Sequence, residues 1–152
     1  MCSSDLQAQQ EGSWLWEQQQ LRIAAMQARS TGAYGQALQL LERKLEITRF
    51  MGARANEAET LTDLAFIRLN QGQPQRALEA LNQALAIQRQ LQLRPSEIKT
   101  LNSIGDLYQS LGAADTAHLF YQQARSIADE LGDYSSGWTQ LSSIAQIGRA
   151  HV

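Results

Sequence analysis

The sequence predicts an all-α fold in which antiparallel helical hairpins stack against one another. Three observations support this prediction. Apolar residues recur at three- and four-residue spacing along most of the chain, which is the pattern of helices with one buried face. Glycines interrupt this pattern at regular intervals, and the whole pattern repeats every forty residues without a gap. One hairpin cannot bury both of its faces, so repeated hairpins are expected to stack.

The clearest copy of the repeat occupies residues 101–132 and contains two helical stripes. The first stripe consists of Leu101, Ile104, Leu107, Tyr108 and Leu111, and the second of Ala117, Tyr121, Ala124, Ile127, Ala128 and Leu131. Gly112 separates the stripes, because glycine adopts the left-handed conformation that ends a helix without a steric clash. The short linker after it predicts two antiparallel helices. Residues 61–92 and 21–52 show the same pattern.

Equivalent positions of the repeats hold the same kinds of residue. A crowded position on the first helix holds Ala25, Ala65, Gly105 and Ala145, and the helix-ending position holds Gly32, Gly72 and Gly112. The second helix carries Ala37, Ala77 or Ala117, then Leu41, Leu81 or Tyr121, and then Lys44, Ala84 or Ala124. Small side chains at these positions allow two helices to approach closely. Lys44 is the exception in this pattern.

The repeat frame gives the organisation of the chain. It assigns residues 7–12 to a partial helix ending at Gly12, residues 13–52, 53–92 and 93–132 to complete repeats, and residues 133–146 to a truncated repeat. Trp14 and Trp16 precede the first stripe. We interpret them as a cover for the open end of the stack; the alternative is a ligand platform.

Two prolines mark helix boundaries. Pro74 fits the first turn of a helix, where its missing N–H has no partner to lose. Gln92 occupies a position that holds glycine in the other repeats. Pro95 follows shortly after it and cannot continue the preceding helix. We therefore expect residues 94–96 to form the turn there, with Ser96 as the cap of the next helix.

The two ends of the chain are related at the level of codons. One oligonucleotide and its reverse complement can encode residues 1–6 and most of residues 147–152, and this oligonucleotide resembles a short-read sequencing adapter. We therefore expect residues 1–6 and 147–152 to be translated adapter, and residues 7–146 to be a fragment of a longer protein. This expectation removes Cys2 and His151 from any chemical argument.

The composition argues against several classes of function. The net charge is −2, and the 13 lysines and arginines are spread along the chain, whereas a nucleic-acid-binding domain concentrates them on one face. No apolar run approaches the roughly 20 residues that span a bilayer, and no signal peptide is recognisable. We expect no nucleic-acid or membrane partner and a cytoplasmic location.

Motifs for catalysis or metal binding are missing from the sequence. There is no glycine-rich phosphate loop, HExxH, CxxC or Gly-x-Ser-x-Gly pattern. His118 has no second histidine or cysteine at ligand spacing, so we interpret it as a partly exposed helix residue. The sequence predicts a protein that is not an enzyme and binds no cofactor or metal.

The repeated apolar, small and glycine positions resemble the tetratricopeptide repeat (TPR) family, in a version of about forty residues rather than thirty-four. The resemblance rests on Leu61, Leu64, Ala65, Gly72, Ala77, Leu81 and Ala84, and on their counterparts Leu101, Ile104, Gly105, Tyr108, Gly112, Ala117, Tyr121 and Ala124. Ala28, Lys44 and Arg68 depart from the family pattern. The resemblance covers nearly the whole chain and implies a right-handed α-solenoid. The turn sequences resemble those of long bacterial, notably cyanobacterial, repeat proteins.

The resemblance also implies a binding surface. In this family the first helix of each repeat lines a concave groove, which in this frame carries Arg22, Met26, Arg29, Glu59, Thr62, Phe66, Leu69, Lys99, Asn102, Asp106 and Gln109. Met26 and Phe66 are apolar on a face that the hairpin does not need. They could anchor a peptide side chain, although Phe66 could equally pack between neighbouring repeats.

The leading functional hypothesis is a module that binds a peptide or protein segment in this groove. Some family members hold a C-terminal carboxylate with lysines and asparagines, and Arg22 and Lys99 occupy similar positions. We do not predict that clamp, because Asp63 and Ser103 replace residues it requires. The rival hypothesis is a regulatory or spacer segment of a larger signalling protein or CHAT-type protease. Self-association through the open ends of the stack is a further expectation.

Overall fold

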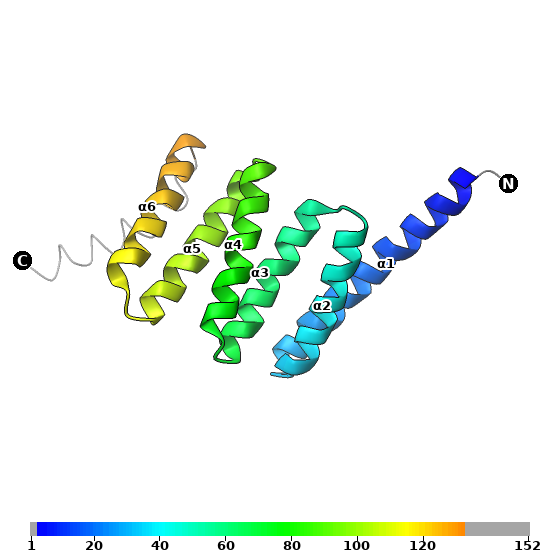
Figure 1. Cartoon of the computed structure of the whole chain (residues 1–152), viewed down its shortest axis with the longest axis horizontal. Helices are drawn as coiled ribbons and strands as arrows, with labels where there is room; N and C mark the ends of the chain where they lie inside the picture. Colours follow the sequence, from blue (N-terminus) through cyan, green and yellow to red (C-terminus); the bar gives the residue numbers. More distant parts are fainter. Residues whose placement is uncertain (1–2, 133–152) are drawn as a thin grey trace, which may run out of the picture. The chain divides into compact units, whose positions relative to one another are not determined.

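A computed structural model describes residues 3–132 of the chain. This range holds six α-helices and no strand: α1 (Ser3–Ser30), α2 (Tyr34–Phe50), α3 (Arg54–Asn70), α4 (Pro74–Gln90), α5 (Arg94–Ser110) and α6 (Ala114–Glu130) (Figure 1). The predicted truncated repeat at 133–146 and the predicted adapter residues 147–152 lie outside it. None of the described helices combines the length and apolar character needed to cross a membrane.

The chain divides within α4 into two compact units, residues 1–87 and 88–152. The first unit contains α1, α2, α3 and most of α4. The second contains the last turn of α4 with α5 and α6. Each unit is described by itself below.

The core of the first unit forms where α1, α2 and α3 meet. Its buried members are Ala25, Ala28, Ala37, Leu41, Leu64 and Ile67. Ala37 has no exposed surface, and Ala25 and Ala65 are 3% and 1% exposed, so the alanine positions are the sites of close helix approach that the sequence predicts. Each buried leucine or isoleucine contributes about 1.5–3 kcal/mol to folding.

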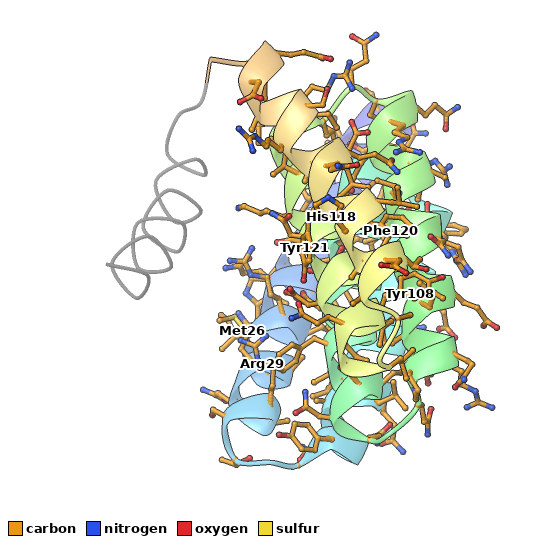
Figure 2. The ribbon with its side chains drawn as sticks, turned by 90° about the vertical axis from the view of Figure 1, so that its left-hand side faces the viewer. Met26, Arg29, Tyr108, His118, Phe120 and Tyr121 are labelled. Atoms are coloured by element: carbon orange, nitrogen blue, oxygen red, sulfur yellow. The ribbon has the colours of Figure 1, made fainter. Side chains whose placement is uncertain are left out.

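In the second unit α5 and α6 pack together across Gly105. A Cβ atom at Gly105 would lie 2.6 Å from Cε1 of Tyr121, a distance that carbon atoms do not tolerate. The missing side chain therefore makes room for the tyrosine ring. Tyr108 and Phe120 form a second contact between the two helices, with their rings stacked at a centroid distance of 5.5 Å and an interplanar angle of 11° (Figure 2).

The connections between helices repeat one turn geometry. Gly32, Gly52, Gly72 and Gly112 each follow a helix by two residues and have φ between 66° and 79°. The residue after each glycine donates its backbone N–H to the carbonyl five residues earlier; in the first turn Ala33 N–H donates to Ala28 C=O at 2.8 Å. This bond satisfies a carbonyl that the end of the helix leaves free.

The turn around Gln92 differs from the prediction. Gln92 itself adopts the left-handed conformation, with φ 55°, and Leu93 N–H donates to Gln88 C=O at 2.8 Å, so this turn matches the others. Helix α5 then begins at Arg94, with Pro95 in its first turn, and Leu93 precedes it without a side-chain cap. The expectation of a turn at residues 94–96 capped by Ser96 is wrong. The main-chain bonds of the repeat determine the turn even where glycine is absent.

The predicted break at Gly12 is also wrong. Helix α1 is continuous from Ser3 to Ser30, and Gly12 lies inside it, so residues 7–12 do not form a separate partial helix. Nothing lies within 4 Å of the position of a Cβ at Gly12. Glycine permits a helix end but does not impose one, because it costs a helix interior only about 1 kcal/mol. Figure 1 shows the N-terminal part of α1 extending beyond α2.

The two tryptophans of α1 have different environments. Trp14 packs edge-on against Phe50 of α2, with ring centroids 4.9 Å apart. Trp16 is 66% exposed, and Phe50 is 76% exposed. Trp14 therefore covers part of α2, whereas Trp16 remains on the surface.

A buried glutamate held by two arginines occurs in both units and is not predicted from the sequence. In the first unit Glu57 Oε1 and Oε2 lie 2.9 Å from Arg49 Nε and 2.6 Å from Arg54 Nη1. In the second unit Glu97, 2% exposed, has the same relation to Arg89 and Arg94.

Each residue of the second cluster lies forty positions after its counterpart in the first cluster. A buried carboxylate requires such partners, since it would otherwise lose its hydration without compensation. The pair of arginines therefore fixes the start of α3 and of α5 against the end of the helix before it.

Candidate functional site

The predicted residues of the first unit come together on one surface, here called the α1–α3 face. It consists of Arg22, Met26 and Arg29 from α1, and Glu59, Thr62, Phe66 and Leu69 from α3. Two contacts join the helices. Arg22 Nη1 lies 3.5 Å from Glu59 Oε1, and the Arg29 guanidinium lies over the Phe66 ring, 4.9 Å from its centroid.

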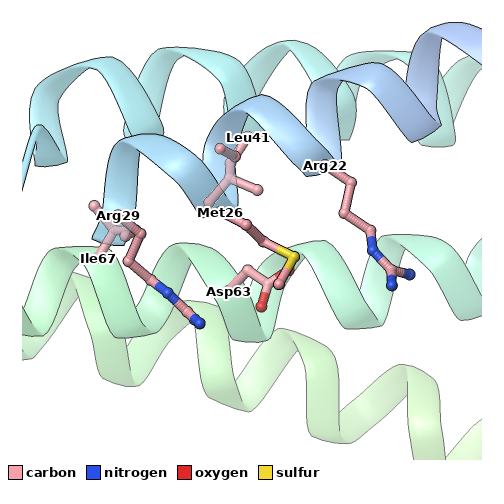
Figure 3. Close-up of a pocket in the computed structure, with 7 residues that line it drawn as sticks. Arg22, Met26, Arg29, Leu41, Asp63 and Ile67 are labelled. Carbon is pink, nitrogen blue, oxygen red and sulfur yellow. The ribbon is translucent and has the colours of Figure 1, made fainter. Parts of the chain in front are cut away.

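Two large apolar side chains are exposed on the α1–α3 face. Met26 is 52% exposed and Phe66 is 47% exposed. Met26 lies between Arg22 and Arg29, one turn from each, and all three side chains extend from the same side of α1 (Figure 3). The cation–π contact orients both Arg29 and Phe66, so the face presents a fixed aromatic ring beside a flexible thioether.

A small cavity lies beneath Met26. Its volume is about 20 Å³, sufficient for one water molecule, and it is lined by Arg22, Ala25, Met26, Arg29, Leu41, Asp63 and Ile67 (Figure 3). The apolar wall comes from core residues. The polar wall comes from Asp63 and the two arginines.

Asp63 and Lys44 are charged residues of this region that the predicted site does not contain. Burial raises the pKa of Asp63 above 3.8, and the positive charges of Lys44, Arg29 and Arg22 oppose this shift. Lys44, in α2, is 2% exposed and lies 3.7 Å from Glu59 Oε2 through its Nζ. The sequence contained one signal for Lys44, because the equivalent position of the other repeats holds alanine.

Thr62 and Leu69 are less available than the other members of the face. The Thr62 hydroxyl donates to Ala58 C=O within α3, at 3.0 Å, and both side chains are half-buried. They border the exposed part of the face rather than project from it.

The predicted residues of α5 lie in the second unit. Lys99 is exposed and Asn102 is half-buried. The Tyr121 hydroxyl of α6 lies 2.6 Å from Asp106 Oδ1 and 3.0 Å from Gln109 Oε1, so both residues hydrogen-bond within the unit. Burial, together with the hydrogen bond to Asp106, raises the pKa of Tyr121 to about 12. The apolar periodicity identifies Tyr121 only as a packing residue, so this hydrogen-bonding role is not visible in the sequence.

His118 is exposed on α6, as predicted. Its Nε2 lies 2.9 Å from Nε2 of Gln122, one turn further along the helix (Figure 2).

Comparison with known proteins gives one family. The profile of the tetratricopeptide repeat matches residues 20–90 and, in a second overlapping match, residues 58–130. No curated protein matches the sequence.

Solved structures give the same fold. The chain is similar to the TPR domain of FLU from Arabidopsis, with 19% identity, a TM-score of 0.66, and coverage of 77% of this chain and 98% of the other. It also resembles the nearly identical TPR-like repeats of a putative kinesin light chain from Podosopora anserina, with 23% identity, a TM-score of 0.64, and coverage of 74% and 56%. BtubC (BKLC) from P. vanneervenii shows 18% identity, a TM-score of 0.63, and coverage of 86% and 63%.

The chain therefore spans somewhat over half the length of the last two proteins. These similarities confirm the predicted all-α fold of stacked helical hairpins.

Proposed function

Because the chain belongs to the tetratricopeptide repeat family, whose stacked hairpins provide extended concave binding surfaces, we propose that it is a protein-interaction module. It binds an extended peptide or protein segment on the first helices of its repeats. The observation that carries this proposal is the pair of exposed apolar side chains, Met26 and Phe66, on a face that the hairpins leave uncovered.

The chemistry of the α1–α3 face defines the segment that fits it. Phe66 and Met26 offer apolar area to one side chain of the segment, and aromatic residues of this kind carry much of the affinity at interfaces. Arg29 already stacks on Phe66, so binding requires little ordering of the ring. Arg22 can hold a carbonyl or a carboxylate of the segment. In the second unit, Lys99 and Asn102 offer groups of the same kind on α5.

The remaining predicted residues have supporting roles in this proposal. Glu59 pairs with Arg22, while Thr62 and Leu69 border the apolar area. Asp106 and Gln109 are held by Tyr121. We expect them to determine specificity more than affinity.

The test is selection of binding peptides from a random display library, followed by measurement of affinity with variants. Phe66→Ala should weaken binding of a selected peptide about 30-fold, equivalent to about 2 kcal/mol. Leu119→Ala is the matched control, because Leu119 is an exposed leucine, 57% accessible, on the second helix of a hairpin.

The control should bind with unchanged affinity, and both variants should keep the helicity of the parent. Equal affinity of Phe66→Ala and the parent, with loss of binding in Leu119→Ala, would place the binding surface on the second helices and contradict the proposal.

A further inference from the structure

Lys44 is a charged residue at a position that holds a buried alanine in the other two repeats. The equivalent residues Ala84 and Ala124 are 0% and 3% exposed, and Lys44 is buried to the same extent, at 2%. Burial of an ammonium group is costly unless hydrogen bonds and an opposite charge compensate it. Stability alone would therefore favour alanine at this position.

The buried charge of Lys44 is only partly compensated. Among the residues that the structure describes, its Nζ has no hydrogen-bond partner. Glu59 bridges the two cations of this region, with Oε1 at 3.5 Å from Arg22 Nη1 and Oε2 at 3.7 Å from Lys44 Nζ. These distances exceed the 2.9 Å and 2.6 Å at which Glu57 meets its own two arginines, so Glu59 is a loosely held bridge.

A cavity opens beside this pair of cations. Its volume is about 210 Å³, and it is lined by Leu15, Gln18, Gln19, Arg22, Lys44, Asn56 and Glu59. Gln18 is 5% exposed, and its Oε1 accepts a hydrogen bond from Asn56 Nδ2 at 3.4 Å. The lining itself thus holds two positive groups, one carboxylate and three amides. Asp63 lies outside the lining and also interacts with the charges of Lys44 and Arg22, but no salt bridge joins it to either cation among the described residues.

We propose that this cavity binds a carboxylate side chain of the protein segment, which takes the place of Glu59 between Lys44 and Arg22. The proposal rests on the proposed function and specifies its partner as an acidic segment. Glu59 shows the geometry, since each of its oxygens faces one cation. Its side chain is 51% exposed and can turn into solvent. An incoming carboxylate would then give the buried ammonium the short contact that it lacks.

The experiment is a titration of the full chain with sodium acetate, followed by backbone amide NMR, with sodium chloride at equal ionic strength as the reference. We expect saturable shifts at Arg22, Lys44 and neighbouring amides with acetate alone. Lys44→Ala should lose the saturable response while its melting temperature stays the same or rises. Arg125→Ala, which removes an exposed cation on α6 outside the proposed binding surface, should keep the response.

Glu59→Gln is the sharpest variant, because Glu59 competes with the ligand. Acetate should bind this variant more tightly than the parent. Weaker binding, a response retained in Lys44→Ala, no saturable response in the parent, or tighter binding of inorganic phosphate than of acetate would each overturn the carboxylate site.

The peptide selection separates this proposal from the proposed function. Selected peptides that need Phe66 but bind equally with glutamine in place of each acidic residue would overturn the carboxylate site alone. Acetate binding at Lys44 without any peptide that needs Phe66 would overturn the proposed function and retain the site.

Discussion

Gln92 is the one residue other than glycine with a left-handed backbone among those that the structure describes. A side chain in this conformation costs about 1–2 kcal/mol. The sequence shows that glycine is missing from this position, but it does not show which conformation follows. Neighbouring hydrogen bonds decide that, because Leu93 N–H reaches Gln88 C=O only if Gln92 takes the strained form.

Gln92→Gly should therefore stabilise the protein. Relief of the strain exceeds the added entropy of the unfolded chain, and we expect a gain of about 0.5–1 kcal/mol in the free energy of unfolding. Urea denaturation followed by circular dichroism measures it. Gln71→Gly is the matched control, since Gln71 has φ −88° and gains nothing from glycine. A loss of stability in Gln92→Gly would show that the left-handed turn at this position is wrong.

Tyr121 gives a pH-dependent prediction. Its pKa is raised from 10.0 to about 12, first by burial and then by the hydrogen bond and charge of Asp106. The folded state holds the phenolic proton more tightly than the unfolded chain. The associated stability is therefore complete below pH 10 and is lost as the pH rises to about 12.

The absorbance of tyrosinate measures this directly. The parent should show a late component that ionises near pH 12, and Tyr121→Phe should remove that late component. A late component that persists in the variant, or that is missing from the parent, would show that the contact with Asp106 is not formed in solution.

At the scale of helices, the packing of α5 on α6 shows that the small residue on the first helix of a hairpin depends on the size of the residue on the second helix. Ala25 shares one core with Leu41, whereas Gly105 lies against Tyr121 in the other unit. The larger ring requires the smaller partner. The forty-residue period made both positions visible in the sequence, but only the structure shows that they contact each other.

This pairing predicts a reversal of sign. Gly105→Ala alone should destabilise the protein, although the same change in most helices stabilises by about 1 kcal/mol, because the new Cβ would meet the Tyr121 ring at 2.6 Å. In a Tyr121→Leu background, which places at position 121 the leucine found at the equivalent position 41, Gly105→Ala should stabilise the protein. Thermal unfolding of the four proteins of this double-mutant cycle measures the coupling. Additive effects would contradict the close approach.

The bounds of the helices followed from the sequence where a glycine ends a helix that packs on a partner, as at Gly32 and Gly72. They did not follow at Gly12, where the helix continues and the N-terminal part of α1 extends beyond its partner α2 (Figure 1). Local sequence therefore indicates where a helix can end, and packing decides whether it does. The glutamates held by two arginines were not predicted, since burial of a charge has no signature in apolar periodicity.

At the scale of the whole molecule, the proposed function depends on which face of the hairpins meets a partner. The family resemblance, applied in the forty-residue frame, assigns Arg22, Met26, Arg29 and Phe66 to one surface, and contacts in the structure join these residues. The resemblance did not assign Lys44 or Asp63 to the surface, because both lie beneath it and depend on the packing of α2 against α3. Exposed positions were thus easier to predict than the charges that support them.

Methyl NMR of the methionines tests the central claim most directly. The chain has three methionines; Met26 lies on the α1–α3 face, and Met51 lies after α2, where its sulfur accepts a hydrogen bond from Gln18 Nε2 at 2.9 Å. On addition of a selected peptide the Met26 methyl resonance should shift and lose exposure to solvent relaxation agents, whereas Met51 should change little. An unchanged Met26 resonance in a saturated complex would show that the segment binds elsewhere.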